Sequence, residues 1–476
     1  MLIQETLLNS QVGWLLFVCL GIIWVGLGLY WGRKAKNMDG FMLAGRNVGL
    51  ALGTATAMAT WITSNTTMLA PQFAFELGIW GMLAYSTASF GLFLFAPLAK
   101  RIRQLMPAGY TSGDFIRLRY GQAAWIVFLM ISIFYSLTWL ISMGMAGGIL
   151  MNSLAGIPYQ WGMSAILFVC VLYTLFGGLY AVIGTDYIQS LIILVGIVVV
   201  GCGVINHIGI SDVYQHVSTE QPMLVNVLLP AAVMAFFNNM LFGIGEIFHS
   251  NVWWSRAFAM RKDVGQKAYF LSGAFWFPIP IAAGFIALAA GPLGINVTSP
   301  DMVGPVIAAS MLGKVGAGIV FIVFFCSLAS SIDSLLAATS DLITEDIYRK
   351  MIHPQATEQQ LRKVAGFVVM GLGVFAWMVC LPRIGTLATV LFFAGPMVGS
   401  CIWPILTGLF WRRANARGAV AGMLSGTTIG LICYFSIGWY VASLIGAAVS
   451  MVVVLLVSAS SKERFDWHVL DETQPV

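Results

Sequence analysis

The stretch Ser327-Leu-Ala-Ser-Ser-Ile-Asp-Ser334 lies deep within an apolar segment that runs from about residue 305 to residue 342. Its four serines recur at steps of three and four residues, so a helix places them on one face. Asp333 adds an ionisable group, and a carboxylate at membrane depth marks a functional site by default. Hydroxyl and carbonyl oxygens are the ligands that hard cations prefer. Serines at this spacing also let helices pack closely, but together with Asp333 they predict a cation site.

The composition places this stretch in a membrane protein. Hydrophobic residues make up 59% of the 476 residues and charged residues only 9%, whereas soluble domains carry about a quarter charged residues. The net charge of +5 comes from loop positions and forms no patch for nucleic acid. We therefore expect a lipid bilayer as the surroundings, no nucleic-acid partner and no obligate protein partner.

Apolar stretches of about 20 residues, long enough to cross a bilayer, occur thirteen times in the chain. Their approximate limits are 12–32, 49–77, 80–99, 122–151, 160–177, 181–205, 225–249, 266–291, 305–342, 361–380, 386–410, 417–437 and 438–460. The predicted fold class is an all-α membrane protein with thirteen transmembrane helices in a single domain.

The basic residues predict the orientation of these spans. If the N-terminus lies outside, all of the 24 Lys and Arg residues except Lys314 and Arg383 fall in cytoplasmic loops or in the C-terminal tail. Cytoplasmic loops carry such an excess of Lys and Arg. We expect a multi-pass protein of the cell membrane with a cytoplasmic C-terminus. This assignment counts Arg256 as a loop residue.

Two spans have the polar residues of a broken helix. The second span carries a run of Thr, Ser and Asn residues over 54–67, followed by Pro71, and the seventh carries Asn, Gly and Glu residues over 238–246. Paired interruptions of this kind indicate an inverted-repeat transporter with its site at the midplane. The predicted repeats are 49–205 and 225–410, with five spans each, and the peripheral helices are 12–32 and 417–460.

Other classes of protein fit this pattern less well. A cation channel does not need paired broken helices. A membrane sensor needs a signalling domain, for which the residues after Ser460 are too few. A membrane enzyme needs a metal cluster or a nucleophile motif, and no such pattern occurs among the five histidines. We therefore expect a transporter and not an enzyme, with no organic cofactor.

Two acidic residues within spans have two interpretations each. Asp186, early in the sixth span, is either a helix-end carboxylate in cytoplasmic water or part of an ion path. Glu246 lies three residues before His249, so the two side chains share a helix face. Glu246 is either half of a cytoplasmic ion pair or a contact for the solute.

Three motifs resemble the sodium:solute symporter family, whose members include proline, sialic acid and sodium/galactose transporters. They are Gly45-Arg46 with Ala59-Thr60-Trp61-Ile62, the Gly177-Gly178-Leu179 run that continues through Thr185-Asp186 to Gln189, and Ser330-Ser331 followed by Ile343-Thr344-Glu345-Asp346-Ile347-Tyr348. The set spans residues 45–348. The resemblance implies a leucine-transporter-like fold and sodium-coupled uptake of a small solute by alternating access.

The resemblance also implies a sodium site. Its ligands are the backbone carbonyls of Ala59, Ile62 and Ser327 and the hydroxyls of Ser330 and Ser331. Asp186 matches a family carboxylate near the sodium path, whose field attracts the ion. Asp333 stands where many relatives have a neutral residue, which leaves a second cation site or a proton-linked role open. Proton-coupled symport through Asp333 or Asp186 is therefore the alternative to sodium coupling.

Within the family, the urea and polyamine permease branch is the most similar. The resemblance rests on Trp61, on the 107–121 loop and on Trp253-Trp254-Ser255-Arg256. Glu246 aligns with the gate tyrosine of sugar transporters, which argues against a sugar. The expected substrate is a small polar solute of the urea, amine or amino-acid kind. The candidate substrate residues are Trp61, Thr63, Thr66, Tyr135, Trp139 and Glu246, although helix packing is the commoner role for such aromatics.

Overall fold

The computed structural model describes residues 7–35, 37–226, 228–297, 299–462 and 464–471, and within these ranges the chain forms helices and no β-strand. The helices of the first part are α1 (Ser10–Gly32), α2 (Met38–Leu43), η1 (Ala44–Arg46), α3 (Leu50–Trp61), α4 (Ser64–Ser86), α5 (Ser89–Leu105), α6 (Ser112–Tyr120), α7 (Gln122–Ala155), α8 (Tyr159–His207), α9 (Ile210–Glu220) and η2 (Pro222–Val225).

The second part continues with a similar series of long and short helices. They are α10 (Pro230–His249), α11 (Asn251–Ala259), α12 (Gly265–Trp276), α13 (Pro278–Leu288), η3 (Pro300–Met302), α14 (Val303–Leu342), the π-helix η4 (Ile343–Ile352), α15 (Glu358–Cys380), α16 (Leu387–Phe392), α17 (Gly395–Phe410), α18 (Ala416–Ser436), α19 (Trp439–Ala459) and η5 (Trp467–Leu470). The all-α prediction is confirmed.

Eleven helical stretches in the described part of the chain are long and apolar enough to cross a membrane, against the thirteen predicted. Three of the eleven have about twice the length that one crossing needs: Pro300–Ile352 with 53 residues, and Ser64–Leu105 and Tyr159–His207 with 42 and 49. Gly313 (φ 65°), Gly78 (φ 68°) and Gly178 (φ 52°) interrupt them, each in a conformation that favours glycine. The predicted spans 49–77 and 80–99, and 160–177 and 181–205, are divided at Gly78 and Gly178. The exact count of thirteen stays a prediction.

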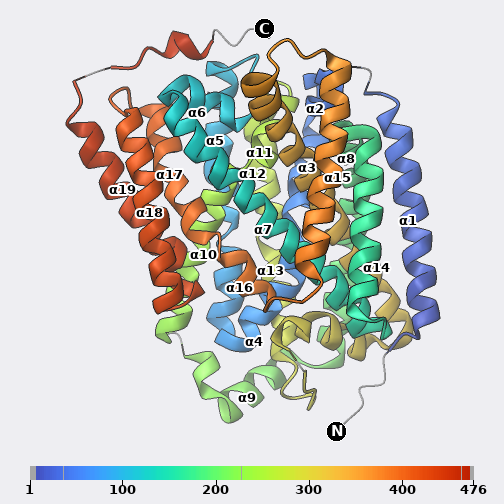
Figure 1. The fold of residues 1–476 in the computed structure, drawn as a ribbon. Coiled ribbons are helices and arrows are strands. Elements are labelled where there is room, and N and C mark those ends of the chain that lie inside the picture. Colours follow the sequence, from blue (N-terminus) through green and yellow to red (C-terminus); the bar gives the residue numbers. More distant parts are fainter. Residues whose placement is uncertain (1–6, 36, 227, 298, 463, 472–476) are drawn as a thin grey trace.

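The two ends of the chain lie at opposite ends of the bundle. In Figure 1, α1 begins at the lower end and α19 finishes at the upper end, as an odd number of crossings requires. Helix α1 packs against α8, whereas α18 and α19 pack against each other and against α17 on the far side. Large apolar side chains such as Leu15, Phe168 and Val195 are exposed on the outer helices, so the protein is a multi-pass membrane protein.

The interruption in the second span is confirmed. Helix α3 ends at Trp61, Ile62 takes a non-helical conformation (φ −81°, ψ 74°), and Thr63 caps α4 by accepting from the Thr66 amide at 3.2 Å. The free Trp61 carbonyl at the break accepts bonds from the Trp276 indole at 2.6 Å and from the Thr66 hydroxyl at 2.9 Å. These bonds satisfy a backbone group that a helix end would otherwise leave unpaired.

The prediction of a helix break within 238–246 is wrong about the position of the break. Helix α10 runs unbroken through this region and the break falls at Ser250 (φ −69°, ψ 130°), after which α11 begins. The polar residues have other tasks, since the Asn239 amide donates to the carbonyls of Ala84 and Tyr85 at 2.8 and 3.0 Å. At Gly243 an added Cβ would lie 2.6 Å from the Cα atom of Ala88, so this glycine serves close helix packing. The division into repeats 49–205 and 225–410 stays a prediction.

Candidate functional site

A cavity lies beside the break between α3 and α4. It is narrow, since the space open to the centre of a water molecule is about 20 Å³. The residues that line it are Trp61, Thr63, Asn65, Tyr85, Ala88, Tyr135, Trp139, Asn239, Phe242, Trp276 and Leu391. They come from the end of α3 and the break, from both ends of α4 and the turn after it, and from α7, α10, α12 and α16. The break thus lets one short segment present side chains from two helix ends to the same space.

Aromatic rings form most of the cavity wall. Trp61 packs edge to face on Trp139 with ring centroids 6.2 Å apart, and it lies tilted on Trp276 at 5.7 Å. Tyr135 lies 5.7 Å from Trp139 on the same helix, α7. Such pairs are geometrically specific and add stability beyond their buried area. The indoles therefore serve packing and line the cavity at once.

The structure brings four of the six candidate substrate residues to the cavity: Trp61, Thr63, Tyr135 and Trp139. Thr66 does not line it, because its hydroxyl is bound to the Trp61 carbonyl. Glu246 lies outside the lining as well, and accepts a bond from the Trp253 indole at 2.9 Å. The proposed role of Glu246 as a cytoplasmic ion-pair partner has no support in the described residues, where its carboxylate makes no ion pair.

Several residues of the lining were not among the predicted substrate residues. Tyr85 and Trp276 are aromatic residues in apolar helices, and their sequence context does not distinguish them from packing residues. Asn65 and Asn239 did carry a signal, because amides within apolar spans need partners. Both residues were interpreted only as signs of broken helices.

The predicted sodium ligands converge on the last turn of α3. The Ser330 hydroxyl donates to the Ala59 carbonyl at 3.1 Å and to the Ser327 carbonyl at 3.2 Å. The Ser331 hydroxyl donates to the Ser327 carbonyl at 2.9 Å and also to the Thr60 carbonyl at 3.3 Å. All five residues are buried. Hydroxyl and carbonyl oxygens are the ligands that hard cations prefer, so the predicted site stays a prediction with its oxygens close together.

Ile62, the remaining predicted ligand, is fully buried at the break itself. The described hydrogen bonds link the serines to Ala59 and Thr60, and none of them involves the Ile62 carbonyl. Thr60 is thus a neighbour of the serines that the motif alignment did not name. The Ser327 hydroxyl donates to the Phe324 carbonyl within its own helix at 2.8 Å, which leaves only its carbonyl for the site.

Asp186 lies in a buried ion pair next to this serine cluster. Its Oδ2 atom is 3.3 Å from the Arg256 guanidinium, and both side chains are fully buried. The same oxygen accepts from the Thr56 hydroxyl at 2.6 Å. Arg256 also donates to the hydroxyls of Thr60 and Ser334 at 2.7 and 2.6 Å. Arg256 therefore balances the Asp186 charge, and the placing of Arg256 in a cytoplasmic loop was wrong because α11 folds it into the core.

Asp333, in contrast, has no cationic partner among the described residues. Its Oδ2 atom accepts from the Tyr173 hydroxyl at 3.0 Å and its Oδ1 atom from the Ser334 hydroxyl at 3.3 Å. The Asp333 side chain is fully buried. Ser334 connects Asp333 to the Asp186–Arg256 ion pair, because its hydroxyl contacts both Asp333 and Arg256.

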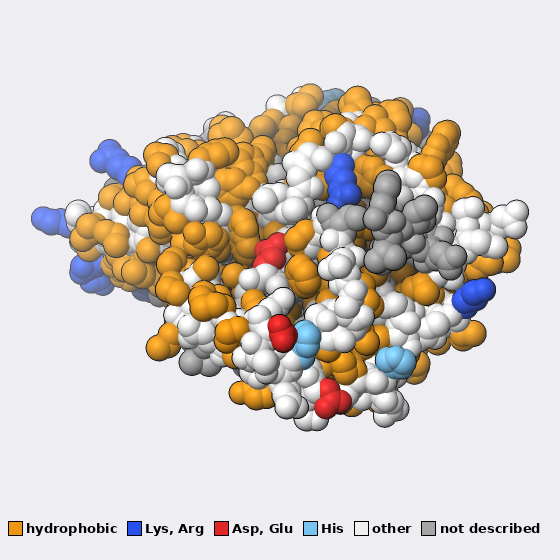
Figure 2. Space-filling view, turned by 90° about the horizontal axis from the view of Figure 1, so that it is seen from below, with side chains coloured by type: hydrophobic (Ala, Val, Ile, Leu, Met, Phe, Trp, Pro, Cys, Tyr) orange, Lys and Arg blue, Asp and Glu red, His pale blue; other side chains and the backbone are white. Residues whose placement is uncertain are grey.

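A second polar network closes the upper end of the bundle. The Lys350 ammonium in η4 lies 2.5 Å from Asp114 in α6 and 3.0 Å from Asp346. Burial disfavours the charged form of Asp114, but the Lys350 and Arg117 charges hold the pKa of this carboxyl below its ordinary value. The Asp346 carboxylate also accepts from the Thr111 hydroxyl at 2.6 Å. Seen from the opposite, lower end, Figure 2 shows few Lys and Arg side chains, most of them at the margin.

A helix interrupted next to a small enclosed cavity, in a bundle of membrane-crossing helices, defines a membrane transporter of the secondary type. The chain belongs to the sodium:solute symporter family, whose sequence model matches residues 41–426. This membership confirms the family resemblance, and with it the prediction of a transporter and not an enzyme.

Individual relatives have diverse substrates. The chain is 27% identical to a urea-proton symporter of Oryza sativa subsp. japonica over 83% of this chain and 60% of the rice protein. It is also 27% identical to an osmoregulated proline transporter of Bacillus subtilis, over 88% of each chain. The fold is similar to the solved structure of a Na+-coupled sialic acid symporter, with a TM-score of 0.79 and 17% identity over 96% of this chain and 98% of that one.

Proposed function

We propose that the protein couples the entry of a sodium ion to the uptake of a small polar organic solute by alternating access. The N-terminus would lie outside and the upper end of Figure 1 would face the cytoplasm, because most Lys and Arg residues fall in the loops on that side. The solute would bind in the aromatic cavity and the ion would bind at the serine cluster.

The observation that carries this proposal is the contact of Ser330 and Ser331 with the carbonyls at the end of α3. Trp61 ends that helix and also lines the cavity. An ion held by the serines and the carbonyls of Ala59, Ile62 and Ser327 would fix the end of α3, and the same segment shapes the cavity. Coupling follows if the ion favours the solute-binding form, and the solute must then favour sodium binding by the same factor.

The driving force for such coupling is adequate. One sodium charge that moves inward down a membrane potential supplies roughly 2.3 kcal/mol per 100 mV, before any concentration gradient is added. That energy corresponds to roughly a fiftyfold accumulation of a neutral solute per 100 mV, because every 1.4 kcal/mol is a factor of ten.

The test is uptake into proteoliposomes with sodium and pH gradients imposed separately. A thermal-shift screen of urea, amines, amino acids and organic acids, with and without sodium, first selects the solute. We expect an inward sodium gradient to accelerate uptake at equal pH. Uptake that follows the pH gradient and ignores sodium would refute sodium coupling.

Proton-coupled symport is the second candidate, and one observation favours it. Asp333 is a fully buried carboxyl group with no cationic neighbour in the described structure, which is the environment of a group that carries a proton. A rice relative is named a urea-proton symporter. Asp186 fits this role less well, because Arg256 already balances its charge. Asp333→Asn would abolish proton-driven uptake and leave sodium-driven uptake in place.

A further inference from the structure

Glu246 is a buried carboxylate that lies one layer behind the cavity wall. It follows Phe242, a lining residue, by one helical turn in α10. Its Oε1 atom accepts from the Trp253 indole at 2.9 Å, whereas its Oε2 atom accepts no hydrogen bond of normal length in the described structure. The Trp253 ring in turn packs edge to face on Trp61, a residue of the cavity lining, with ring centroids 5.3 Å apart.

Glu246 lacks the basic partner that Asp186, another buried acidic residue, has in Arg256. Asp186 is equally buried, yet it is paired with Arg256 at 3.3 Å. No Lys, Arg or His nitrogen among the described residues lies within 4.0 Å of the Glu246 carboxylate. Burial without a partner favours the protonated form of a carboxyl group, as at Asp333, and a positive charge beside it favours the ionised form. A cation from outside the chain would therefore allow Glu246 to ionise and would be stabilised by it.

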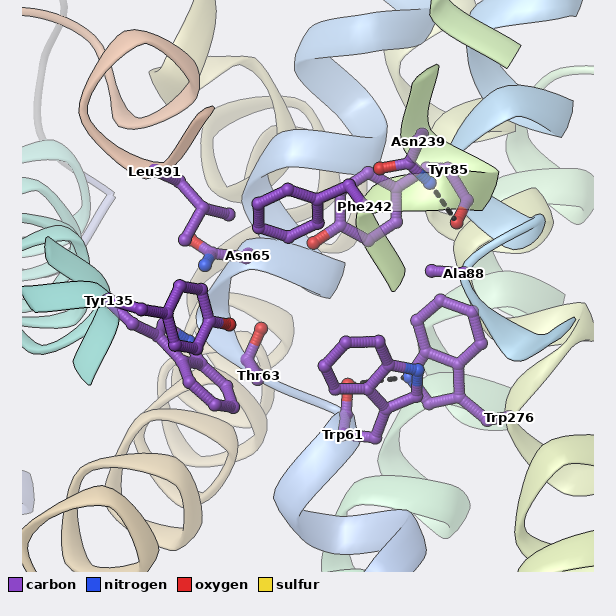
Figure 3. A pocket seen from close by; sticks show the side chains of 11 residues that line it. Trp61, Thr63, Asn65, Tyr85, Ala88, Tyr135, Asn239, Phe242, Trp276 and Leu391 are labelled. Carbon is purple, nitrogen blue, oxygen red and sulfur yellow. Dashed lines mark hydrogen bonds between the residues drawn. The ribbon is translucent and has the colours of Figure 1, made fainter. Parts of the chain in front are cut away.

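The cavity lining offers the place for that positive charge. Among its residues are three tryptophans, two tyrosines and one phenylalanine, and none is Lys, Arg or His. Figure 3 shows Tyr135 and Tyr85 on different sides of the cavity. Aromatic faces attract cations, by about 2 kcal/mol when the site is desolvated. A solute with a free carboxylate would meet no basic group in this lining.

We propose that the cavity binds a small organic cation with a guanidinium or ammonium group, whose charge Glu246 balances from behind the aromatic wall. This inference rests on the proposed function and narrows its substrate class. A neutral solute of the same shape would contact the same rings but leave Glu246 uncompensated. Charge, rather than shape, is therefore the property that this site selects.

The experiment compares methylguanidinium with methylurea, two solutes of nearly equal shape that differ in charge. Binding of each is measured at millimolar concentrations to the purified full chain in sodium chloride, by isothermal titration calorimetry. A cation–π contribution of about 1–2 kcal/mol predicts that methylguanidinium binds roughly ten times more tightly. Equal affinities, or tighter binding of methylurea, would overturn the proposal, and so would binding of an amino acid or organic acid when methylguanidinium does not bind.

Variants locate the preference at Glu246. Glu246→Gln should reduce the ratio of the two affinities to near one, and Glu246→Asp should keep a preference for the cation. The control is Glu76→Gln, because Glu76 is an exposed carboxylate that accepts a bond from Gln72 at 3.0 Å. A preference that survives in Glu246→Gln would contradict the proposal. The wild-type comparison needs no variant, so the proposal stays testable if Glu246→Gln does not fold.

The same titrations repeated in potassium chloride separate this inference from sodium coupling. If the cation is preferred in both salts with equal affinity, sodium coupling fails and the substrate class stands. If binding requires sodium but methylurea is preferred, the substrate class fails and sodium coupling stands.

Discussion

The ion pair between Asp186 and Arg256 provides a prediction whose magnitude follows from its burial. Both side chains are fully buried and 3.3 Å apart. Removing one partner leaves a charge without compensation in the core, which costs about 3–5 kcal/mol. Removing both charges together avoids that cost. We therefore expect Arg256→Gln and Asp186→Asn each to lower the free energy of unfolding by about 3–5 kcal/mol, and the double variant to regain most of the loss.

The assay is denaturant unfolding of the purified protein in detergent, analysed as a double-mutant cycle. Arg117→Gln is the control, because Arg117 is 38% exposed and lies 3.8 Å from Asp114. Such a surface pair contributes about 0–1 kcal/mol. Losses for Arg256→Gln and Asp186→Asn that simply add in the double variant would refute the account of this pair.

Two further predictions concern the helix break and the upper end of the bundle. Thr63→Val removes the cap that accepts from the Thr66 amide and should cost about 1 kcal/mol of stability. Thr63→Ser keeps the hydroxyl and should cost less. Equal thermal unfolding temperatures for Thr63→Val and the wild type would contradict the stabilising role of this cap. Lys350→Met removes the cation that lies between Asp114 and Asp346, so α6 and η4 should exchange amide hydrogens faster in mass spectrometry. Lys350→Arg should exchange nearly as the wild type does, and unchanged exchange in Lys350→Met would show that the network does not hold this end closed.

The sequence was sufficient where local chemistry decides the structure. Span limits follow from apolar length, and the divisions near Gly78 and Gly178 were found because polar or glycine-rich residues separate the runs. A break in the second span was predicted from the hydroxyl-rich run over 54–67, and the structure places it at Ile62. The serines of α14 were placed against Ala59 by a motif, and the hydrogen bonds between these segments agree with that placement.

The sequence was insufficient where the outcome depends on how distant helices pack. Asn239 and Gly243 look like residues of a broken helix, yet they satisfy carbonyls and permit close packing on the end of α4 and the turn after it. Arg256 looks like a loop residue beside a basic stretch. The guanidinium of Arg256 reaches Asp186, 70 residues earlier in the chain, only because of the direction that α11 takes after Ser250. Tyr85 carries no sequence signal that separates a cavity residue from a packing residue.

The central claim, a sodium ion held by the serines of α14 and the end of α3, is tested most directly by equilibrium binding of radioactive sodium to the purified protein. We expect saturable binding in the wild type and a loss of affinity of about tenfold or more in Ser331→Ala. Ser327→Ala is the matched control and should bind sodium as the wild type does, since the Ser327 hydroxyl is bound to Phe324 and only its carbonyl faces the site. Equal sodium affinity in Ser331→Ala and wild type would contradict the account.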